Sequence, residues 1–175
     1  METKQVILVD ENDVPRGTME KLEAHRKGEL HRAFSIFIFN SKQEMLLQKR
    51  ASGKYHSGGL WTNTCCSHPV PGERMEITTH KRLQEEMGFD CELKEIFHFT
   101  YKTDLDNELT EHELDHVFIG YYNDAPQANT EEVSEWKYVA VETLQKEMEK
   151  YPEQFTVWFR LVFPRVVEYL QEHTF

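Results

Sequence analysis

The sequence predicts an α/β or α+β fold in which a β-sheet is sandwiched between helices. Residues 33–39 are apolar on both faces, which is typical of a central strand covered on each side. Residues 75–88 carry apolar side chains at helical spacing and end in a glycine, a common helix stop. Alternating, strand-like segments follow, and helical patterns occupy the C-terminal end.

The first half of the chain is expected to be mostly strands. In order, we expect a strand over 5–9, a polar turn through Asp13, Pro15 and Gly17, a short helix over 19–27, a strand over 33–39, a turn over 40–43 and a strand over 45–49. Residues 51–59 contain three glycines and few core side chains, so this stretch is expected to be a loop.

The second half is expected to alternate helices and strands. In the helix over 75–88, Ile77, Leu83 and Met87 are the expected apolar positions. The remaining predicted elements are strands over 95–102 and 111–122 around a turn at 105–107, a short strand over 136–139, and helices over 141–150 and 152–171.

Composition narrows the classes of protein and partner. The 175 residues are expected to form one domain, 1–175. A net charge of −11 repels nucleic acid and anionic membranes, so neither is an expected partner. The three cysteines do not suggest a disulfide framework, and the N-terminus does not have the order of a signal peptide. We therefore expect a cytoplasmic location, and a monomer or weak homodimer.

Nitrogen and oxygen donors for a divalent metal are present, but their spacing is not diagnostic. They are His25, His31, His68, Glu111 and Glu113. Glu111 and Glu113 are two apart on a predicted strand, so they share a face. No zinc-finger spacing relates the histidines, and each alone is more often an ordinary surface or core residue.

A thiol and an imidazole lie close together at Cys66 and His68. A thiol can act as an acid, or as a base once its pKa is shifted. The alternative is that Cys65 and Cys66 are small core residues of a strand. Adjacent strand residues face opposite ways, so at most one of the two cysteines can line a given site.

The helix over 75–88 has two pairs of charged residues at helical spacing, Arg82 with Glu86 and Lys81 with Glu85. These residues either form solvent-exposed ion pairs, or they line one edge of the helix and bind a metal-bound phosphate. Four basic residues could together bind a diphosphate, and they are Lys21, Arg50, Lys54 and Arg82. The usual alternative is that such residues simply lie on the surface. Trp158, considered with Tyr101, could hold a cation on its ring or simply pack in the core.

Two motifs together resemble a known family. Trp61-Thr-Asn-Thr-Cys-Cys-Ser-His-Pro69 and Thr110-Glu-His-Glu-Leu114 are similar in content, order and separation to the active-site motifs of type 1 isopentenyl-diphosphate isomerases. The likeness extends from about Val6 to the C-terminal helix. It implies a Nudix-type fold with a mixed sheet sandwiched between helices. A degenerate Nudix box is visible at Ser67, Glu73, Lys81, Arg82, Leu83, Glu85, Glu86, Gly88 and Phe89, and Ser67, Lys81 and Arg82 depart from the hydrolase pattern.

The resemblance also implies a set of ligands. His25, His31, His68, Glu111 and Glu113 would hold Mn²⁺ or Mg²⁺, with Zn²⁺ as a further possibility. A second ion, Mg²⁺, would bridge Glu86 and the substrate diphosphate. The same diphosphate would be bound by Lys21, Arg50, Lys54 and Arg82.

The reaction implied by the resemblance interconverts isopentenyl and dimethylallyl diphosphate in isoprenoid biosynthesis. Protonation and deprotonation would take place on opposite faces of the alkene, through a tertiary carbocation. Glu113 assisted by Tyr101 is the expected acid in the forward direction, Cys66 the expected base, and Trp158 would face the cation. The loop over 51–59 and the N-terminal segment are candidate lids that exclude water, and Cys65 is assigned no role.

Two other functions remain open at this point. One is a Nudix pyrophosphohydrolase acting on a nucleoside diphosphate derivative, with Glu73, Glu85 and Glu86 as metal ligands. The other is a binding module that is stabilised by a metal and has no catalytic activity.

Overall fold

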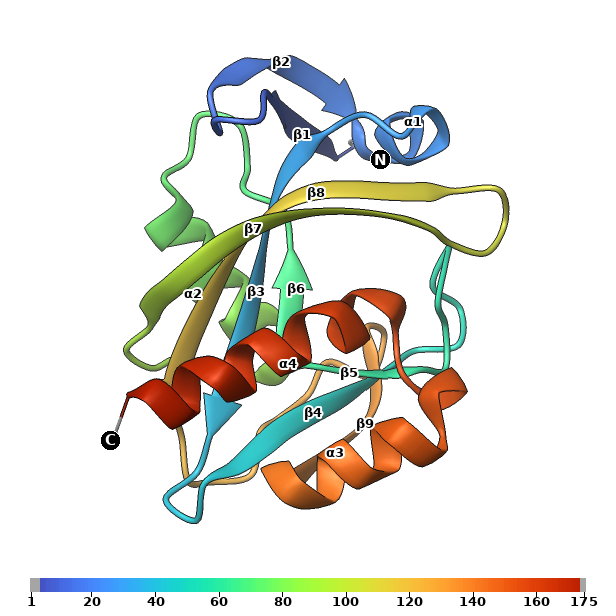
Figure 1. Ribbon diagram of the computed structural model, residues 1–175. Helices are drawn as coiled ribbons and strands as arrows, with labels where there is room; N and C mark the ends of the chain where they lie inside the picture. Colours follow the sequence, from blue (N-terminus) through green and yellow to red (C-terminus); the bar gives the residue numbers. More distant parts are fainter. Residues whose placement is uncertain (1–3, 174–175) are drawn as a thin grey trace.

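The computed structural model describes residues 4–173, which form a mixed sheet with helices on both faces (Figure 1). The strands are β1 (Gln5–Val9), β2 (Pro15–Glu20), β3 (His31–Phe39), β4 (Glu44–Arg50), β5 (Trp61–Thr62), β6 (Cys65–Ser67), β7 (Lys94–Asp104), β8 (Thr110–Tyr121) and β9 (Val133–Ala140). The helices are α1 (Lys21–Lys27), α2 (Met75–Met87), α3 (Val141–Lys150) and α4 (Val157–Glu172), with a 3₁₀ turn η1 (Pro152–Gln154) before α4.

Strand β3 is the centre of the sheet. It runs parallel to β8, with His31 opposite Glu113 and Phe39 opposite Tyr121. It is antiparallel to β6, with Ser35 opposite Cys66. The antiparallel strand β7 continues the sheet beyond β8, and β4 and β9 extend it on the other side. Segments distant in sequence therefore meet on either side of β3.

The side chains of β3 alternate between two hydrophobic cores, as expected for a strand covered on both faces. Phe37 and Phe39 belong to the core under α4 and α3, which also contains Phe159. Phe34 and Ile36 belong to the core on the other face, against α2. In Figure 1, α4 and α3 lie in front of the sheet and α2 behind it. The predicted sandwich is confirmed.

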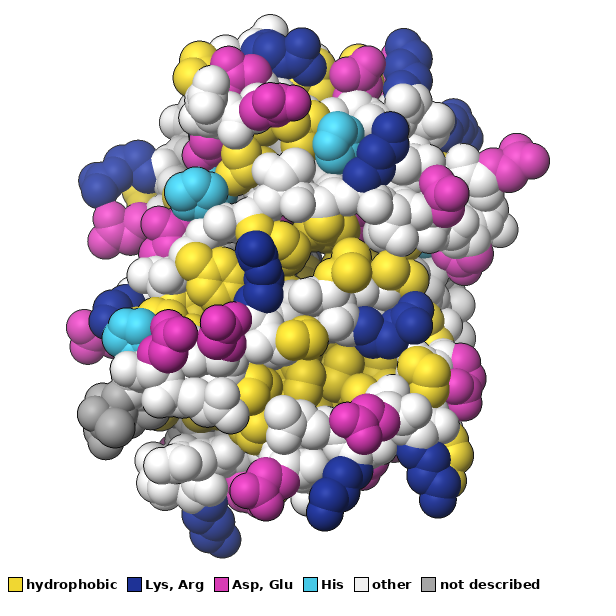
Figure 2. Space-filling model, viewed as in Figure 1, with side chains coloured by type: hydrophobic (Ala, Val, Ile, Leu, Met, Phe, Trp, Pro, Cys, Tyr) yellow, Lys and Arg dark blue, Asp and Glu magenta, His cyan; other side chains and the backbone are white. Residues whose placement is uncertain are grey.

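The face that carries α4 and α3 presents hydrophobic side chains over its middle, surrounded by charges of both signs (Figure 2). Exposed hydrophobic residues in the described chain include Leu161 of α4 and Trp136 of β9. None of the helices within residues 4–173 has the length and apolarity needed to cross a bilayer.

Two expectations for the N-terminal region were wrong in detail. Pro15 and Gly17 lie in β2, because this segment pairs with β1. The first helix begins at Lys21 because Met19 pairs with Val6 in the same hairpin, and the Glu20 carboxylate then caps the helix.

Two expectations for the helices also need correction. Ile77 is 50% exposed, so it is not a core position of α2. The predicted helix over 152–171 is divided: η1 ends at an extended Phe155, and Thr156 caps α4 by accepting a hydrogen bond from the Phe159 amide. Phe155 is buried in the core, and this burial accounts for the break between the two helical segments.

Candidate active site

The parallel pairing of β3 and β8 brings the histidines and glutamates to one end of the sheet. His31 at the start of β3 lies opposite Glu113 of β8, and Tyr101 of β7 lies opposite Glu113 from the other side. His68 follows β6 directly, and His25 comes from α1, which packs on β8. The metal-ligand candidates named from the sequence are therefore brought together.

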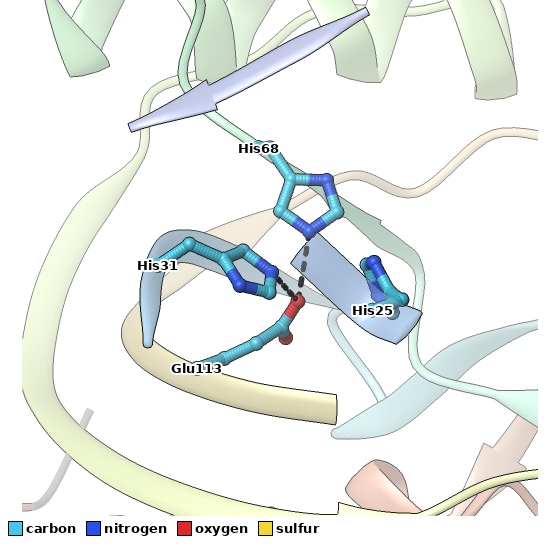
Figure 3. Close-up of side chains that lie close together, drawn as sticks. All are labelled: His25, His31, His68 and Glu113. Carbon is cyan, nitrogen blue, oxygen red and sulfur yellow. Dashed lines mark hydrogen bonds and ion pairs between the residues drawn. The ribbon is translucent and has the colours of Figure 1, made fainter. Parts of the chain in front are cut away.

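The carboxylate of Glu113 is the centre of this group (Figure 3). Its Oε2 lies 3.0 Å from His31 Nε2 and 2.7 Å from His68 Nε2. One donor atom from each of His25, His31, His68 and Glu113 lies within 4.8 Å of the other three. The donors of a single first-row ion are spaced within this range, since each bond to the metal is about 2 Å long.

The outer hydrogen bonds of the histidines leave Nε2 available for a metal. His25 Nδ1 lies 2.8 Å from the carbonyl oxygen of Lys21, and His31 Nδ1 lies 2.9 Å from that of Glu29. A carbonyl only accepts, so Nδ1 carries the proton in both rings. His25 Nε2 is buried and has no hydrogen-bond partner within the described residues. Such an arrangement is typical of ligating histidines, and it fits a bound cation.

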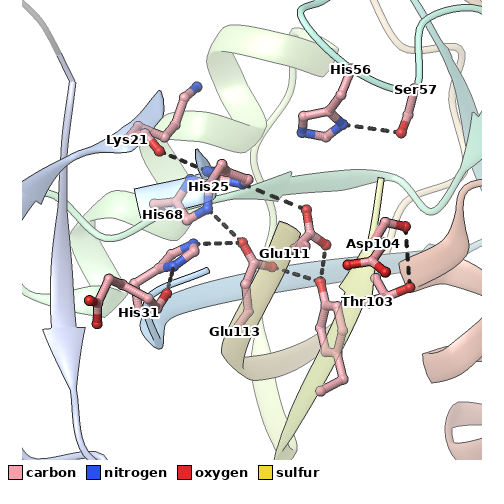
Figure 4. Close-up of polar contacts among 12 residues, drawn as sticks. Lys21, His25, His31, His56, Ser57, His68, Thr103, Asp104, Glu111 and Glu113 are labelled. Atoms are coloured by element: carbon pink, nitrogen blue, oxygen red, sulfur yellow. Dashed lines mark hydrogen bonds and ion pairs between the residues drawn. The ribbon is translucent and has the colours of Figure 1, made fainter. Parts of the chain in front are cut away.

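Tyr101 connects the two glutamates of the set. Its hydroxyl donates to Glu113 Oε1 at 2.7 Å and also contacts Glu111 Oε1. Glu111 in turn lies 3.8 Å from His25 Nε2, and Figure 4 shows how these glutamates and histidines are placed. As expected from their spacing, Glu111 and Glu113 share a face of β8.

Burial and neighbouring charges shift the pKa values of the glutamates and of His68 in different directions. Burial alone would raise the pKa of Glu113, but the adjacent rings of His31 and His68 hold this pKa well below its usual range. Burial and the charge of Glu113 raise the pKa of Glu111. Burial lowers the pKa of His68 to about 4, so this imidazole stays neutral and can act as a ligand at neutral pH.

Removal of a bound divalent metal is expected to destabilise the fold. At a metal concentration of 100 times Kd, binding contributes about 2.7 kcal/mol, which corresponds to a Tm change of roughly 5–10 °C for a chain of this size. Differential scanning fluorimetry of the Mn²⁺-loaded protein before and after EDTA checks this. Mn²⁺ should restore the Tm of the wild type but not of His31→Gln. A Tm that does not respond to chelation would contradict a metal at these residues.

Cys66 lies on β6 with its thiol in a polar corner. Its Sγ donates to Asn63 Oδ1 at 2.9 Å and lies 3.6 Å from Ser35 Oγ, whose hydroxyl donates to Asp115. Burial, followed by the negative charge of Asp115, raises the pKa of the Cys66 thiol. The Asn63 amide donates to two backbone carbonyls, which directs its oxygen towards the thiol.

A cavity of about 60 Å³ joins the thiol to the glutamates. Cys66, Glu111, Glu113 and Trp158 all line it, whereas His25 and His31 are not among its lining residues. Trp158, in α4, is 4% exposed, and the Arg50 guanidinium lies 5.1 Å from its ring centroid. The tryptophan therefore lies in the site as well as in the core.

All of the predicted diphosphate-binding residues line the same cavity, and they are Lys21, Arg50, Lys54 and Arg82. Burial, with the nearby charges of Lys4 and Lys54, lowers the pKa of Lys21 to about 8. Lys54 also contacts Glu132, another residue of the cavity wall. Local basic charge therefore gathers here on a chain that is acidic as a whole.

Residues 29–159 match the NUDIX domain family. Isopentenyl-diphosphate Delta-isomerase of Pectobacterium atrosepticum is 56% identical over 171 residues, covering 98% of this chain and 96% of that protein. Isopentenyl-diphosphate Delta-isomerase 2 of Photorhabdus laumondii is 51% identical over 157 residues, with 90% and 89% covered. The chain belongs to the isopentenyl-diphosphate Delta-isomerase family.

Solved structures agree with this family's fold. A Deinococcus radiodurans protein aligns with a TM-score of 0.71 at 17% identity, covering 84% of this chain and 90% of that one. The MutT protein of Methanosarcina mazei Go1 aligns with a TM-score of 0.64 at 21% identity, covering 78% and 91%. At these identities the likeness concerns the fold alone.

The degenerate Nudix box is placed in a way that suits an isomerase of this family. Glu86 of α2 lines the cavity, and its Oε2 accepts hydrogen bonds from Arg82 and Cys65 at 3.1 Å each. Glu73 accepts from Thr78 instead, and Glu85 is exposed. The three carboxylates named for a hydrolase therefore do not converge on this cavity.

One predicted ion pair on α2 was wrong. Lys81 lies 3.8 Å from Glu73, not against Glu85, because Glu85 pairs with Arg82.

One cysteine has more contacts than expected. Cys65 faces away from Cys66, as strand geometry requires. The sequence assigned Cys65 no role, but in the structure its thiol contacts Glu86.

Several residues around the cavity were not singled out from the sequence. They are Lys4, Phe34, Ser35, Tyr55, His56 and Glu132. His56 was within the predicted lid loop over 51–59, and a histidine in this glycine-rich loop was a signal that could have been followed. Lys4 belongs to the N-terminal segment also named as a lid, of which residues 1–3 lie outside the described part of the chain.

Proposed function

We propose that this chain interconverts isopentenyl and dimethylallyl diphosphate by proton transfer on opposite faces of the alkene. One observation carries the proposal: the Cys66 thiol and the Glu113 carboxylate line one small cavity, together with Trp158 and four basic side chains. Two proton-transfer groups, a cation-stabilising ring and a diphosphate site are what this reaction needs. The reaction proceeds through a tertiary carbocation in the substrate.

Glu113 and Cys66 are the proposed acid and base. The Tyr101 hydroxyl lies within hydrogen-bond distance of both Glu111 Oε1 and Glu113 Oε1 and can donate to either, so it can pass a proton between these carboxylates and the alkene side of the cavity. Cys66 approaches from β6, a different strand. In the forward direction the Glu113–Tyr101 pair would protonate the double bond, and Cys66 would remove the proton.

The charge state of the free site bears on this assignment. Burial raises the pKa of Cys66, whereas the adjacent histidine rings lower the pKa of Glu113 against the effect of burial. The free site therefore favours a protonated thiol and an ionised carboxylate. For the forward roles, one proton must first move towards the carboxylate pair, and the reverse reaction can start from the free state directly.

The walls of the cavity would protect the carbocation. Trp158 presents a buried ring, which stabilises a cation more strongly when water is absent. The volume of about 60 Å³ is below the ~300 Å³ at which typical ligand pockets begin, and we propose that the 51–59 loop moves to admit substrate. Reclosure would then exclude water, which would otherwise capture the cation.

The proposed metal ligands are His25, His31, His68, Glu111 and Glu113, with Mn²⁺ or Mg²⁺ as the preferred ion and Zn²⁺ as an alternative. A bound divalent ion would supply positive charge next to the glutamates and would fix their positions. Glu86 would hold a Mg²⁺ that arrives with the diphosphate, while Arg82 orients Glu86.

The activity test is direct. The protein is incubated with isopentenyl diphosphate and Mg²⁺, and the alkene signals are followed by NMR. Appearance of dimethylallyl diphosphate supports the proposal. No product with Mg²⁺, Mn²⁺ or Zn²⁺ would overturn it, and phosphate release from a nucleoside diphosphate derivative would indicate a hydrolase instead.

The Lys21 ammonium should make substrate capture dependent on pH. With its pKa lowered to about 8, Lys21 is charged below that pH and loses its charge as the pH rises through it. We expect kcat/KM to fall about 10- to 100-fold above pH 8, since a charged hydrogen bond contributes about 1.5–3 kcal/mol. Lys21→Arg should move this fall to higher pH. A profile that is the same in both proteins would contradict the assignment.

We propose further that the chain acts as one domain, 1–175, in the cytoplasm, as a monomer or weak homodimer. The small diphosphate would be its ligand, with neither nucleic acid nor membrane as a partner, since the net charge is −11.

A further inference from the structure

The loop over residues 51–59 places a fourth histidine against the metal-binding group. His56 is 4% exposed, and its ring stacks on that of His25 at a centroid distance of 5.7 Å. One donor atom from each of His25, His56 and Glu111 lies within 4.8 Å of the other two. In the view of Figure 4, His56 and His31 lie on opposite sides of His25 and Glu111.

His25 belongs to both groups of donors, which places them next to each other. Its Nδ1 is held by the Lys21 carbonyl, so Nε2 is the atom left for a metal. This Nε2 is buried without a hydrogen-bond partner among the described residues, although five other histidine or glutamate side chains lie close by. An orphaned nitrogen in such surroundings is accounted for by a bound cation.

We propose that His56 is an additional ligand of the metal at His25, contributed by the 51–59 loop. This inference rests on the metal site proposed above. The two groups of donors share His25, and an ion that drew both together would have His25, His31, His68, Glu111, Glu113 and His56 around it. These are six nitrogen and oxygen donors, the number that octahedral Mn²⁺ or Mg²⁺ prefers.

The surroundings of His56 suit a ligand. Its Nδ1 lies 3.1 Å from the Ser57 hydroxyl, an outer hydrogen bond of the kind that orients ligating imidazoles.

This ligand would connect the metal to the diphosphate-binding residues. Lys54 is in the same loop, and the Arg50 guanidinium donates to the His56 carbonyl oxygen at 3.2 Å. Coordination through His56 would hold these basic side chains over the cavity. Metal binding would therefore close the loop, and release of His56 would let it open for substrate.

The test uses Mn²⁺ alone, without any diphosphate. His56→Phe keeps a ring against Trp158 and Tyr55 but has no donor atom. We expect its Mn²⁺ dissociation constant, measured by EPR of free Mn²⁺, to rise about 10- to 100-fold. Line broadening in H₂¹⁷O should show one more water on the bound ion. Ser52→Ala, an exposed position in the same loop, should match the wild type.

The outcomes separate this inference from the metal site itself. A wild-type protein that binds no Mn²⁺ overturns the metal site and with it the role of His56. Unchanged affinity and an unchanged water count in His56→Phe overturn only the role of His56 and assign it to packing, whatever happens to kcat.

Hydrogen exchange of the wild type provides a second measurement that needs no folded variant. Amides of residues 51–59 should exchange about 10-fold more slowly with Mn²⁺ than without it, because coordination holds the loop closed. Equal exchange rates with and without bound Mn²⁺ would overturn the proposal.

Discussion

Cys66→Ala is expected to lower kcat for isomerisation by about 10²- to 10⁴-fold, the range for loss of one acid–base group. The Cys66 thiol of β6 lines the cavity, and it lies next to Ser35 and Asn63. The rate of dimethylallyl diphosphate formation by NMR measures the effect. A nucleoside diphosphate hydrolase would lose little activity from the same change.

The control for this prediction is the third cysteine. Cys91→Ala removes a thiol that is absent from the cavity wall, so its kcat should stay within a factor of about two of the wild type. Both variants should keep the circular dichroism spectrum of the parent. If Cys66→Ala retains more than a tenth of the wild-type kcat, Cys66 is not a proton-transfer group.

Glu113→Gln is expected to have the larger effect, because Glu113 takes part in two functions. Its Oε2 contacts Nε2 of both His31 and His68, and its Oε1 accepts from Tyr101. The variant should lose metal affinity by at least about 100-fold and kcat by a further 10²- to 10⁴-fold. Mn²⁺ titration and the NMR assay measure the two losses separately.

Glu111→Gln is the matched variant on the same face of β8. Glu111 contacts His25 and Tyr101, but its proposed role is confined to binding the metal and supporting Tyr101. At saturating Mn²⁺ we expect Glu111→Gln to recover most of its kcat, whereas Glu113→Gln should stay inactive. Equal recovery of the two variants would contradict a proton-transfer role for Glu113.

Local patterns in the sequence were sufficient for most of the fold. The apolar run over 33–39 identified a strand covered on both faces, and the spacing over 75–88 identified α2. These predictions hold because the faces of a strand or helix that become buried determine the spacing of apolar residues in the sequence. The limits of α1 and the division before α4 were missed, since hairpin pairing and the burial of Phe155 decide them.

The site was accessible from the sequence only through the likeness of two short motifs to a family. Spacing shows that Glu111 and Glu113 share a strand face, and that at most one of Cys65 and Cys66 faces a given site. Spacing alone carries no information on which distant segments meet, so it left His25, His31 and His68 as isolated histidines.

Tertiary structure decided the rest. The parallel register of β3 and β8 places His31 opposite Glu113, and β7 adds Tyr101 across the same residue. The loop over 51–59 then folds over this end of the sheet and brings His56 to His25. These contacts join segments far apart in the chain, and strand pairing and core packing determine them. By itself the sequence determined which residues could do the chemistry, and the register of the sheet determined which of them meet.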